Sequence, residues 1–133
     1  MIDYNPLLCL DFYKTCHCDQ YPKELTKLVS YYTPRMSRLH DVDKITMFGL
    51  QAFINEYLVE AFDKNFFELP FDDVLSTYLW VLKATIGTSG VGATRIRKLH
   101  ELGYLPLEIR AVPEGTRTNI HVPQIEISNT HPD

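Results

Sequence analysis

Cysteine is scarce in this chain, and it lacks both a targeting signal and a long apolar run. The three cysteines among its 133 residues, Cys9, Cys16 and Cys18, are odd in number and clustered, which makes a poor disulfide framework. The first ten residues have no basic segment of the kind that begins a signal peptide. No apolar run approaches the length that crosses a bilayer. We therefore expect a soluble, cytoplasmic protein with no membrane association.

Positive charge is also in short supply. The 13 Lys and Arg residues are outnumbered by 17 Asp and Glu, which gives a formal net charge of -4. A general nucleic-acid binder gains its affinity by neutralising phosphates with Lys and Arg, so this balance argues against that class. A local anion site is still allowed, because it needs only one or two arginines and some backbone N–H groups.

The length and composition fit one compact domain. Hydrophobic residues make up 45% of the chain and charged residues 23%, which is enough for a core and argues against wholesale disorder. No internal repeat or Gly/Ser linker divides the sequence. We expect residues 1–133 to form a single domain of the α+β class, with a mostly antiparallel sheet and roughly three to four helices.

Helix signals occur in four places. Asp11 suits the N-cap of a short helix that runs towards Gln20. From Lys44 onwards apolar residues recur at helical spacing, namely Met47, Leu50, Ile54, Tyr57 and Leu58. Pro70 and Gly87 suit the two ends of the next helix, and another is predicted from about Gly92 to Leu102, ending at Gly103.

Strand signals dominate the rest of the chain. The second half of residues 24–33 reads as a strand, and alternation over residues 105–112 indicates a half-buried one, followed by a turn at residues 112–115. A last strand is expected over residues 120–128, where Pro123 implies an edge position or a bulge. The closing residues 129–133 form a loop with no helix after it, so we expect a truncated chain.

The densest polar and aromatic cluster lies at residues 11–17. With Asp11 as the cap, Tyr13 falls in the first helical turn and shares a face with His17 by the four-residue spacing. A stacking ring and a carboxylate at a helix start suit a small aromatic amide, one through its face and the other through its N–H donors. The alternative is an ordinary capped amphipathic helix, which the spacing alone favours.

Other motifs are weaker. Cys16-His17-Cys18 has no second Cys or His pair at zinc spacing, so we expect no metal site there. The run Gly87–Ala93 resembles a phosphate-cradling loop without its Lys-Ser/Thr ending. Basic residues between Gly90 and Gly103 are similar to a helix-hairpin-helix element, although a solvated face is the commoner reading. Arg35, just past a strand, has the geometry to bind phosphate oxygens bidentately.

Five motifs occur in a fixed order along nearly the whole chain, with the weakest agreement over residues 60–98. They are Asp11-Phe12-Tyr13-Lys14 with His17 and Gln20-Tyr21-Pro22, then Ser30–Arg35, Phe48-Gly49-Leu50-Gln51, Leu105–Gly115 and Asn129-Thr130-His131-Pro132. Together they resemble the nicotinamide phosphoribosyltransferase family, whose opening reads D-x-Y-K-x-x-H-x-x-Q-Y-P.

The resemblance implies the N-terminal domain of a type II phosphoribosyltransferase. That family joins nicotinamide to phosphoribosyl pyrophosphate with Mg²⁺, and its homodimers place active sites at the subunit interface. By position, Asp11 would meet the carboxamide, Tyr13 would stack on the nicotinamide ring and Arg35 would touch the phosphates. Lys14 and His17 match the motif as further possible site residues. No residue of this chain is expected to bind metal or to act as a catalytic group.

The family's catalytic histidine, main phosphate-binding loops and barrel domain would lie beyond residue 133. The resemblance therefore implies that this chain is inactive alone. Two other functions stay open: a non-catalytic interaction protein that retains this domain, and a nucleic-acid-binding module built on Gly90 to Gly103.

Overall fold

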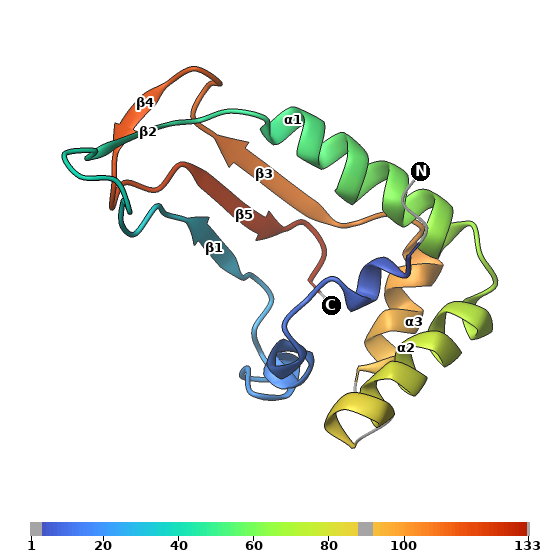
Figure 1. The fold of residues 1–133 in the computed structure, drawn as a ribbon. Coiled ribbons are helices and arrows are strands. Elements are labelled where there is room, and N and C mark those ends of the chain that lie inside the picture. The colour runs from blue at the N-terminus through green and yellow to red at the C-terminus, as the bar shows by residue number, and fades with distance from the viewer. Residues whose placement is uncertain (1–3, 88–91, 133) are drawn as a thin grey trace. The chain divides into compact units, whose positions relative to one another are not determined.

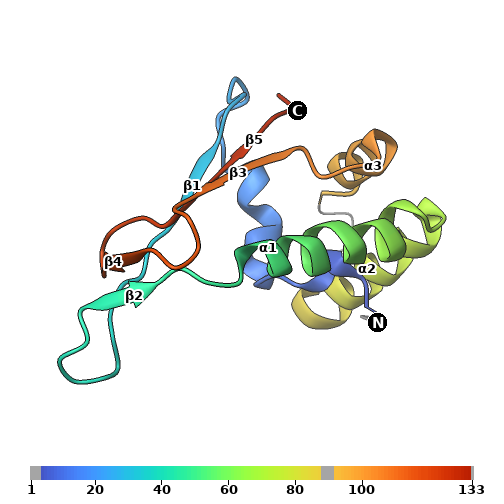
Figure 2. The same cartoon turned by 90° about the horizontal axis from the view of Figure 1, so that it is seen from above.

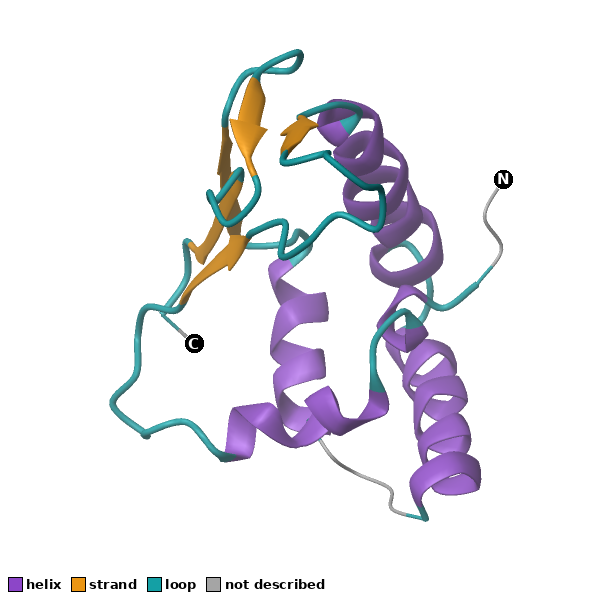
Figure 3. Ribbon diagram, turned by 60° about the vertical axis from the view of Figure 1, so that its left-hand side comes forward, coloured by secondary structure: helices purple, strands orange, loops and turns teal. Residues whose placement is uncertain are grey.

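The chain folds into helices and antiparallel strands, which confirms the expected α+β class. The structure is a computed structural model that describes residues 4–87 and 92–132 (Figure 1). Its residues form two compact units: unit 1 comprises Met1–Glu24 and Ile54–Leu105, and unit 2 comprises Leu25–Phe53 and Pro106–Asp133. All strands of the described chain belong to unit 2, and Figure 3 distinguishes them from the helices by colour.

Unit 1 is helical. Its elements are η1 (Pro6–Leu8) and η2 (Phe12–Asp19), both 3₁₀ helices, the π-helical segments η3 (Ile54–Glu60) and η4 (Asp63–Phe67), and the α-helices α2 (Phe71–Ile86) and α3 (Ala93–Leu102). Helix α2 packs against α3 and η4 (Figures 1 and 2). Phe66, Val74, Tyr78 and Leu82 are buried here, and with Ala61 they form the apolar core of the described part of this unit.

The two α-helices end where the sequence predicts. Pro70 occupies the N-cap of α2 and Gly87 its C-cap, with φ of 74° in the left-handed region that glycine adopts without a Cβ clash. Gly103 ends α3 in the same way, with φ of 78°, and its N–H bonds the carbonyls of Leu99 and His100. No helix within the described ranges is both long and apolar enough to cross a membrane.

Unit 2 contains two antiparallel sheets and the short helix α1 (Leu50–Phe53). The larger sheet has the order β1 (Val29–Tyr32), β5 (Ile125–Asn129) and β3 (Leu107–Ala111), so β5 is central. The smaller sheet pairs β2 (Lys44–Thr46) with β4 (Arg117–Asn119). In the larger sheet Glu126 is the register partner of both Tyr31 and Arg110, which places these three side chains on one face.

The helix expected from Lys44 begins later than its apolar spacing predicts. Lys44 and its two successors form β2, and the backbone of Met47 bonds Gly115 and Thr116. Gly49, with φ of 85°, then turns the chain into α1. Met47 is buried as expected, but it lies outside the helix because its backbone extends a strand pairing.

The last strand also begins later than predicted. His121 has φ of 70° and Pro123 follows it, so the expected start of the strand is a turn. The strand itself, β5, starts at Ile125 and lies in the middle of its sheet, where a proline would remove a ladder hydrogen bond. Pro123 therefore precedes a central strand, and its expected edge position is wrong.

Candidate substrate-binding site

Helix η2 carries the polar and aromatic cluster of the N-terminal segment. Asn5 anchors this segment to unit 1: its Oδ1 accepts from Leu7 N at 3.0 Å and its Nδ2 donates to Val74 O at 3.0 Å. Thr15 is buried, and its hydroxyl donates to Phe12 O at 2.7 Å. The Asn5 bonds therefore fix η1, which precedes η2, and Thr15 lies on the buried side of η2 while Asp11, Tyr13 and Lys14 are exposed.

Asp11 occupies the N-cap position of η2, but its side chain does not cap the helix. The carboxylate lies 3.5 Å from Lys14 Nζ, and the Asp11 side chain is 62% exposed. The expected cap is therefore wrong. Because the carboxylate does not bond the helix N–H groups, its oxygens are accessible to donors from a ligand.

Tyr13 presents an exposed ring in the same cluster. Its centroid is 5.5 Å from that of His17, with the planes tilted by 57°, and Lys14 Nζ lies 5.9 Å from the Tyr13 centroid. The expected Tyr13–His17 contact is thus present. The tyrosine is 62% exposed, which leaves room for an aromatic ligand to stack on it. Asp11, Tyr13, Lys14 and His17 form one cluster on one helix.

Arg35 belongs to unit 2, where it follows β1. It lines an open hollow together with Met36 and Arg38. Pro34 is buried and its carbonyl accepts from His121 N at 2.7 Å, which fixes the backbone just before Arg35. Arg35 was predicted from the sequence as a site residue, but Arg38 was not. In a non-helical segment, three-residue spacing does not indicate that two side chains line the same hollow.

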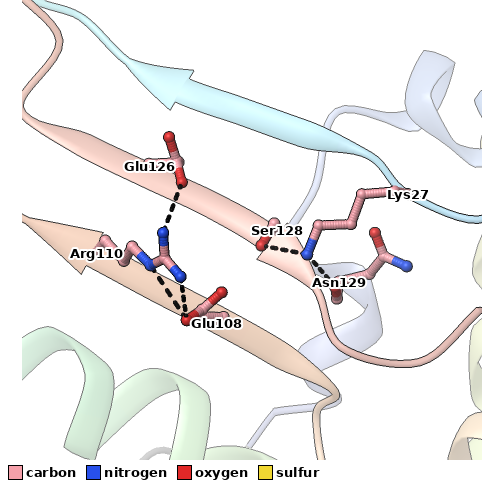
Figure 4. Close-up of polar contacts among 6 residues, drawn as sticks. All are labelled: Lys27, Glu108, Arg110, Glu126, Ser128 and Asn129. Atoms are coloured by element: carbon pink, nitrogen blue, oxygen red, sulfur yellow. Dashed lines mark hydrogen bonds and ion pairs between the residues drawn. The ribbon is translucent and has the colours of Figure 1, made fainter.

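Strands β3 and β5 carry a polar network on one face of the larger sheet (Figure 4). Arg110 Nη2 and Nε bond Glu108 Oε1 at 2.8 and 3.1 Å, and Nη1 lies 3.9 Å from Glu126. The hydrogen bond with Glu126 raises the pKa of Tyr31 above its ordinary value. These groups are mutually paired and solvent-exposed, so we assign them to the surface of the sheet rather than to a binding site.

The Cys16-His17-Cys18 motif gains no metal-binding partners among the described residues. Cys9 and Cys16 are free, and the side chain of Cys18 lies outside the described part of the chain. Within the described ranges no three His, Cys, Asp or Glu side chains converge on a possible metal position.

The basic helix α3 is partly engaged by its own unit. Arg97 lies 4.1 Å from the centroid of Phe71 and 3.8 Å from Asp72. Arg95 and Lys98 also make interactions within the chain. Gly90 and Val91, which the nucleic-acid reading requires, lie outside the described residues, as do Thr88 and Ser89 of the Gly-rich run.

The candidate residues are thus exposed in each unit: Asp11 and Tyr13 in unit 1, and Arg35, which lines the hollow, in unit 2. Residues 5–68 match the model of a protein family described as nicotinamide phosphoribosyltransferase, N-terminal domain, and this range includes Asp11, Tyr13 and Arg35. The chain is also 44% identical, over 131 residues, to the nicotinamide phosphoribosyltransferase of Acinetobacter baylyi. Both comparisons agree with the resemblance to the nicotinamide phosphoribosyltransferase family that the sequence motifs show.

The match covers very different shares of the two proteins. It includes 95% of this chain but only 26% of the Acinetobacter baylyi protein, so the chain spans about a quarter of that relative's length.

Proposed function

We propose that this chain acts as the N-terminal portion of a nicotinamide phosphoribosyltransferase. The reaction joins nicotinamide to phosphoribosyl pyrophosphate and yields nicotinamide mononucleotide and pyrophosphate, a step of NAD salvage. One observation supports the proposal: the Tyr13 ring is exposed beside Asp11, and the Asp11 carboxylate does not cap η2. Both residues lie within the range that matches the family.

Each site residue then has a distinct task. Tyr13 stacks on the pyridine ring of nicotinamide, and Asp11 accepts a hydrogen bond from the carboxamide N–H group. Arg35 donates to phosphate oxygens through its planar fork. Lys14 and His17 flank Tyr13 and restrict the motion of its ring, which lowers the entropy lost when the ligand binds.

The catalytic groups come from outside this chain. Charge that develops at the sugar and on the departing pyrophosphate needs preorganised donors beyond the two arginines of the hollow. We therefore propose that the active site is completed by the barrel domain of a second subunit in a homodimer. The chain alone is then inactive as a pentosyltransferase.

The Mg²⁺ that the proposed reaction uses has no matching donor set among the described residues of this domain. The described residues offer no cluster of three acidic, His or Cys side chains, so they do not fit a resident metal ion. In the proposal the ion accompanies the diphosphate and is held elsewhere in the enzyme. We place the reaction in the cytoplasm, where a reducing environment keeps thiols such as Cys9 and Cys16 free.

Complementation tests the proposal. The chain is mixed with an Acinetobacter baylyi transferase that lacks the region it matches, and nicotinamide mononucleotide formation is followed. We expect activity with the native chain, and with Tyr13→Ala a value of kcat/KM for nicotinamide lower by about tenfold, from the lost stacking. Tyr104→Ala, which removes a 52% exposed tyrosine elsewhere in unit 1, is the matched control and should change little.

Three outcomes contradict the proposal. Turnover by the pure chain would show that it is not an incomplete site. Equal losses with Tyr13→Ala and Tyr104→Ala would remove the special role of Tyr13. Absence of complementation, with both partners folded by circular dichroism, would favour an interaction protein that retains the domain.

A further inference from the structure

The segment that follows β1 has a fixed backbone on both sides of its arginines. Before Arg35, the buried Pro34 is tied through its carbonyl to His121 N at 2.7 Å. Around Arg38, the Ser37 hydroxyl accepts from Leu39 N at 3.0 Å and donates to Leu39 O at 3.1 Å. These bonds reduce the backbone freedom of Arg35 and Arg38, so less entropy is lost when the two side chains bind one ligand.

Both arginines line the same hollow. Within residues 4–87 and 92–132, no carboxylate lies within ion-pair distance of Arg35 or Arg38, whereas Arg97 and Arg110 are paired. The nearby Asp41 is held by His40 Nδ1 at 2.6 Å. Both guanidinium groups are cations, and a bound anion relieves their mutual repulsion.

The shape of the donors selects the class of anion. A guanidinium offers parallel N–H groups that match two oxygens of one phosphoryl group. Two guanidiniums at one hollow therefore match a ligand with two linked phosphoryl groups better than a single phosphate or a carboxylate. Met36 lies between the two arginines in the chain and contributes an apolar lining without a competing charge.

We propose that Arg38 joins Arg35 in a two-guanidinium site for the diphosphate group of the substrate and product. The inference rests on the proposed function, which supplies the diphosphate, and it makes Arg38 a substrate-contacting residue. Each arginine contacts one phosphoryl group.

The test begins with inorganic pyrophosphate. It is titrated into the folded chain, and binding is followed by isothermal calorimetry and by the NMR shifts of residues 35–38. We expect Arg38→Ala to weaken pyrophosphate binding by about tenfold, from the loss of charge-assisted hydrogen bonds, and to change phosphate binding far less. Arg38→Lys should restore part of the affinity, because it keeps the charge without the fork.

Arg117→Ala is the matched control. Arg117 is exposed, belongs to unit 2 and makes no ion pair with the described part of the chain, but it does not line the hollow. An equal loss with Arg117→Ala would show that net charge alone attracts the anion. Equal binding by the native chain and by Arg38→Ala would also overturn the inference.

The complementation assay separates this inference from the proposed function. We expect Arg38→Ala to raise the KM for phosphoribosyl pyrophosphate and to leave the KM for nicotinamide unchanged. If complementation succeeds and neither KM changes, Arg38 has no substrate contact and the inference fails while the function stands. If complementation fails but pyrophosphate binding depends on Arg38, the anion site stands and the proposed function fails.

Discussion

Asn129, the last residue of β5, holds together two segments that are distant in sequence. Its Oδ1 accepts from Leu28 N at 2.7 Å, and its Nδ2 donates to Thr26 O at 2.8 Å and to His131 O at 2.6 Å. Lys27 adds bonds from its Nζ to Ser128 Oγ at 2.9 Å and to Asn129 O at 2.8 Å (Figure 4). The side chain of one asparagine thus fixes the start of β1 and the loop that follows β5.

The substitution Asn129→Ala removes three hydrogen bonds and leaves the two made by Lys27. A buried neutral bond contributes about 1 kcal/mol net, and water can replace part of that where the partners are exposed, as Thr26 and Leu28 are. We therefore expect the free energy of unfolding to fall by about 2 kcal/mol. For a chain of this size that corresponds to a decrease in Tm of about 8 °C.

Thermal and urea unfolding, followed by circular dichroism, measure this loss. Hydrogen exchange adds a local test, because the amide of Leu28 should lose its protection when its acceptor is removed. The control is Asn119→Ala, which changes an exposed asparagine of β4 whose side chain makes no hydrogen bond within the described chain. If the two variants agree within about 0.5 kcal/mol, the clamp contributes nothing and the reasoning is refuted.

Three further predictions concern other parts of the fold. Leu82→Ala should lower the stability by about 3 kcal/mol in urea unfolding, since Leu82 is fully buried, and the exposed Lys83→Ala should not. Gly103→Ala should destabilise by about 1 kcal/mol through its φ of 78°, although no atom lies within 4 Å of the added Cβ; a gain in Tm would contradict this. Glu126→Gln should lower the pKa of Tyr31, which the hydrogen bond with Glu126 raises, as ultraviolet titration can measure. The pKa of Tyr31 is higher in the folded state than in the unfolded state. This bond therefore stabilises the fold below the unfolded pKa, and its contribution is lost as pH rises through the folded pKa. An unchanged titration of Tyr31 in the variant would contradict the assignment.

Helix ends were predictable because they are set by local chemistry. Pro70 and Gly87 bound α2, and Gly103 ends α3, as their backbone preferences require. The short sheet was not predictable in the same way. Each of β2 and β4 has three residues, and Thr46 finds its partner Arg117 far along the chain. Such strands exist because of non-local pairing, so their own sequences carry little signal.

The candidate site likewise combines a local feature, which was predictable from the sequence, with a feature that depends on the fold, which was not. The Tyr13–His17 contact was expected from the four-residue spacing of an α-helix, and it is present although η2 is a 3₁₀ helix, in which residues three apart align. The assignment of Asp11 and Tyr13 to a nicotinamide site came from the family resemblance, since spacing alone favoured an ordinary capped helix. Arg38 was missed, because the hollow that it shares with Arg35 depends on how unit 2 folds around the segment after β1.

The failure of Asp11 to cap η2 leads to a prediction that separates binding from stability. An aspartate that caps a helix contributes about 1 kcal/mol, and Asn5, which bonds Leu7 N and Val74 O, should lose at least that much on Asn5→Ala. Asp11 makes no such bond, and its exposed pair with Lys14 is weak. We therefore expect Asp11→Ala to change the free energy of unfolding by less than about 0.5 kcal/mol while it raises the KM for nicotinamide in the complemented enzyme. Local rules are broken most often at functional sites, where a side chain is reserved for a ligand. A stability loss as large as that of Asn5→Ala, with an unchanged KM, would return Asp11 to the role of an ordinary helix residue.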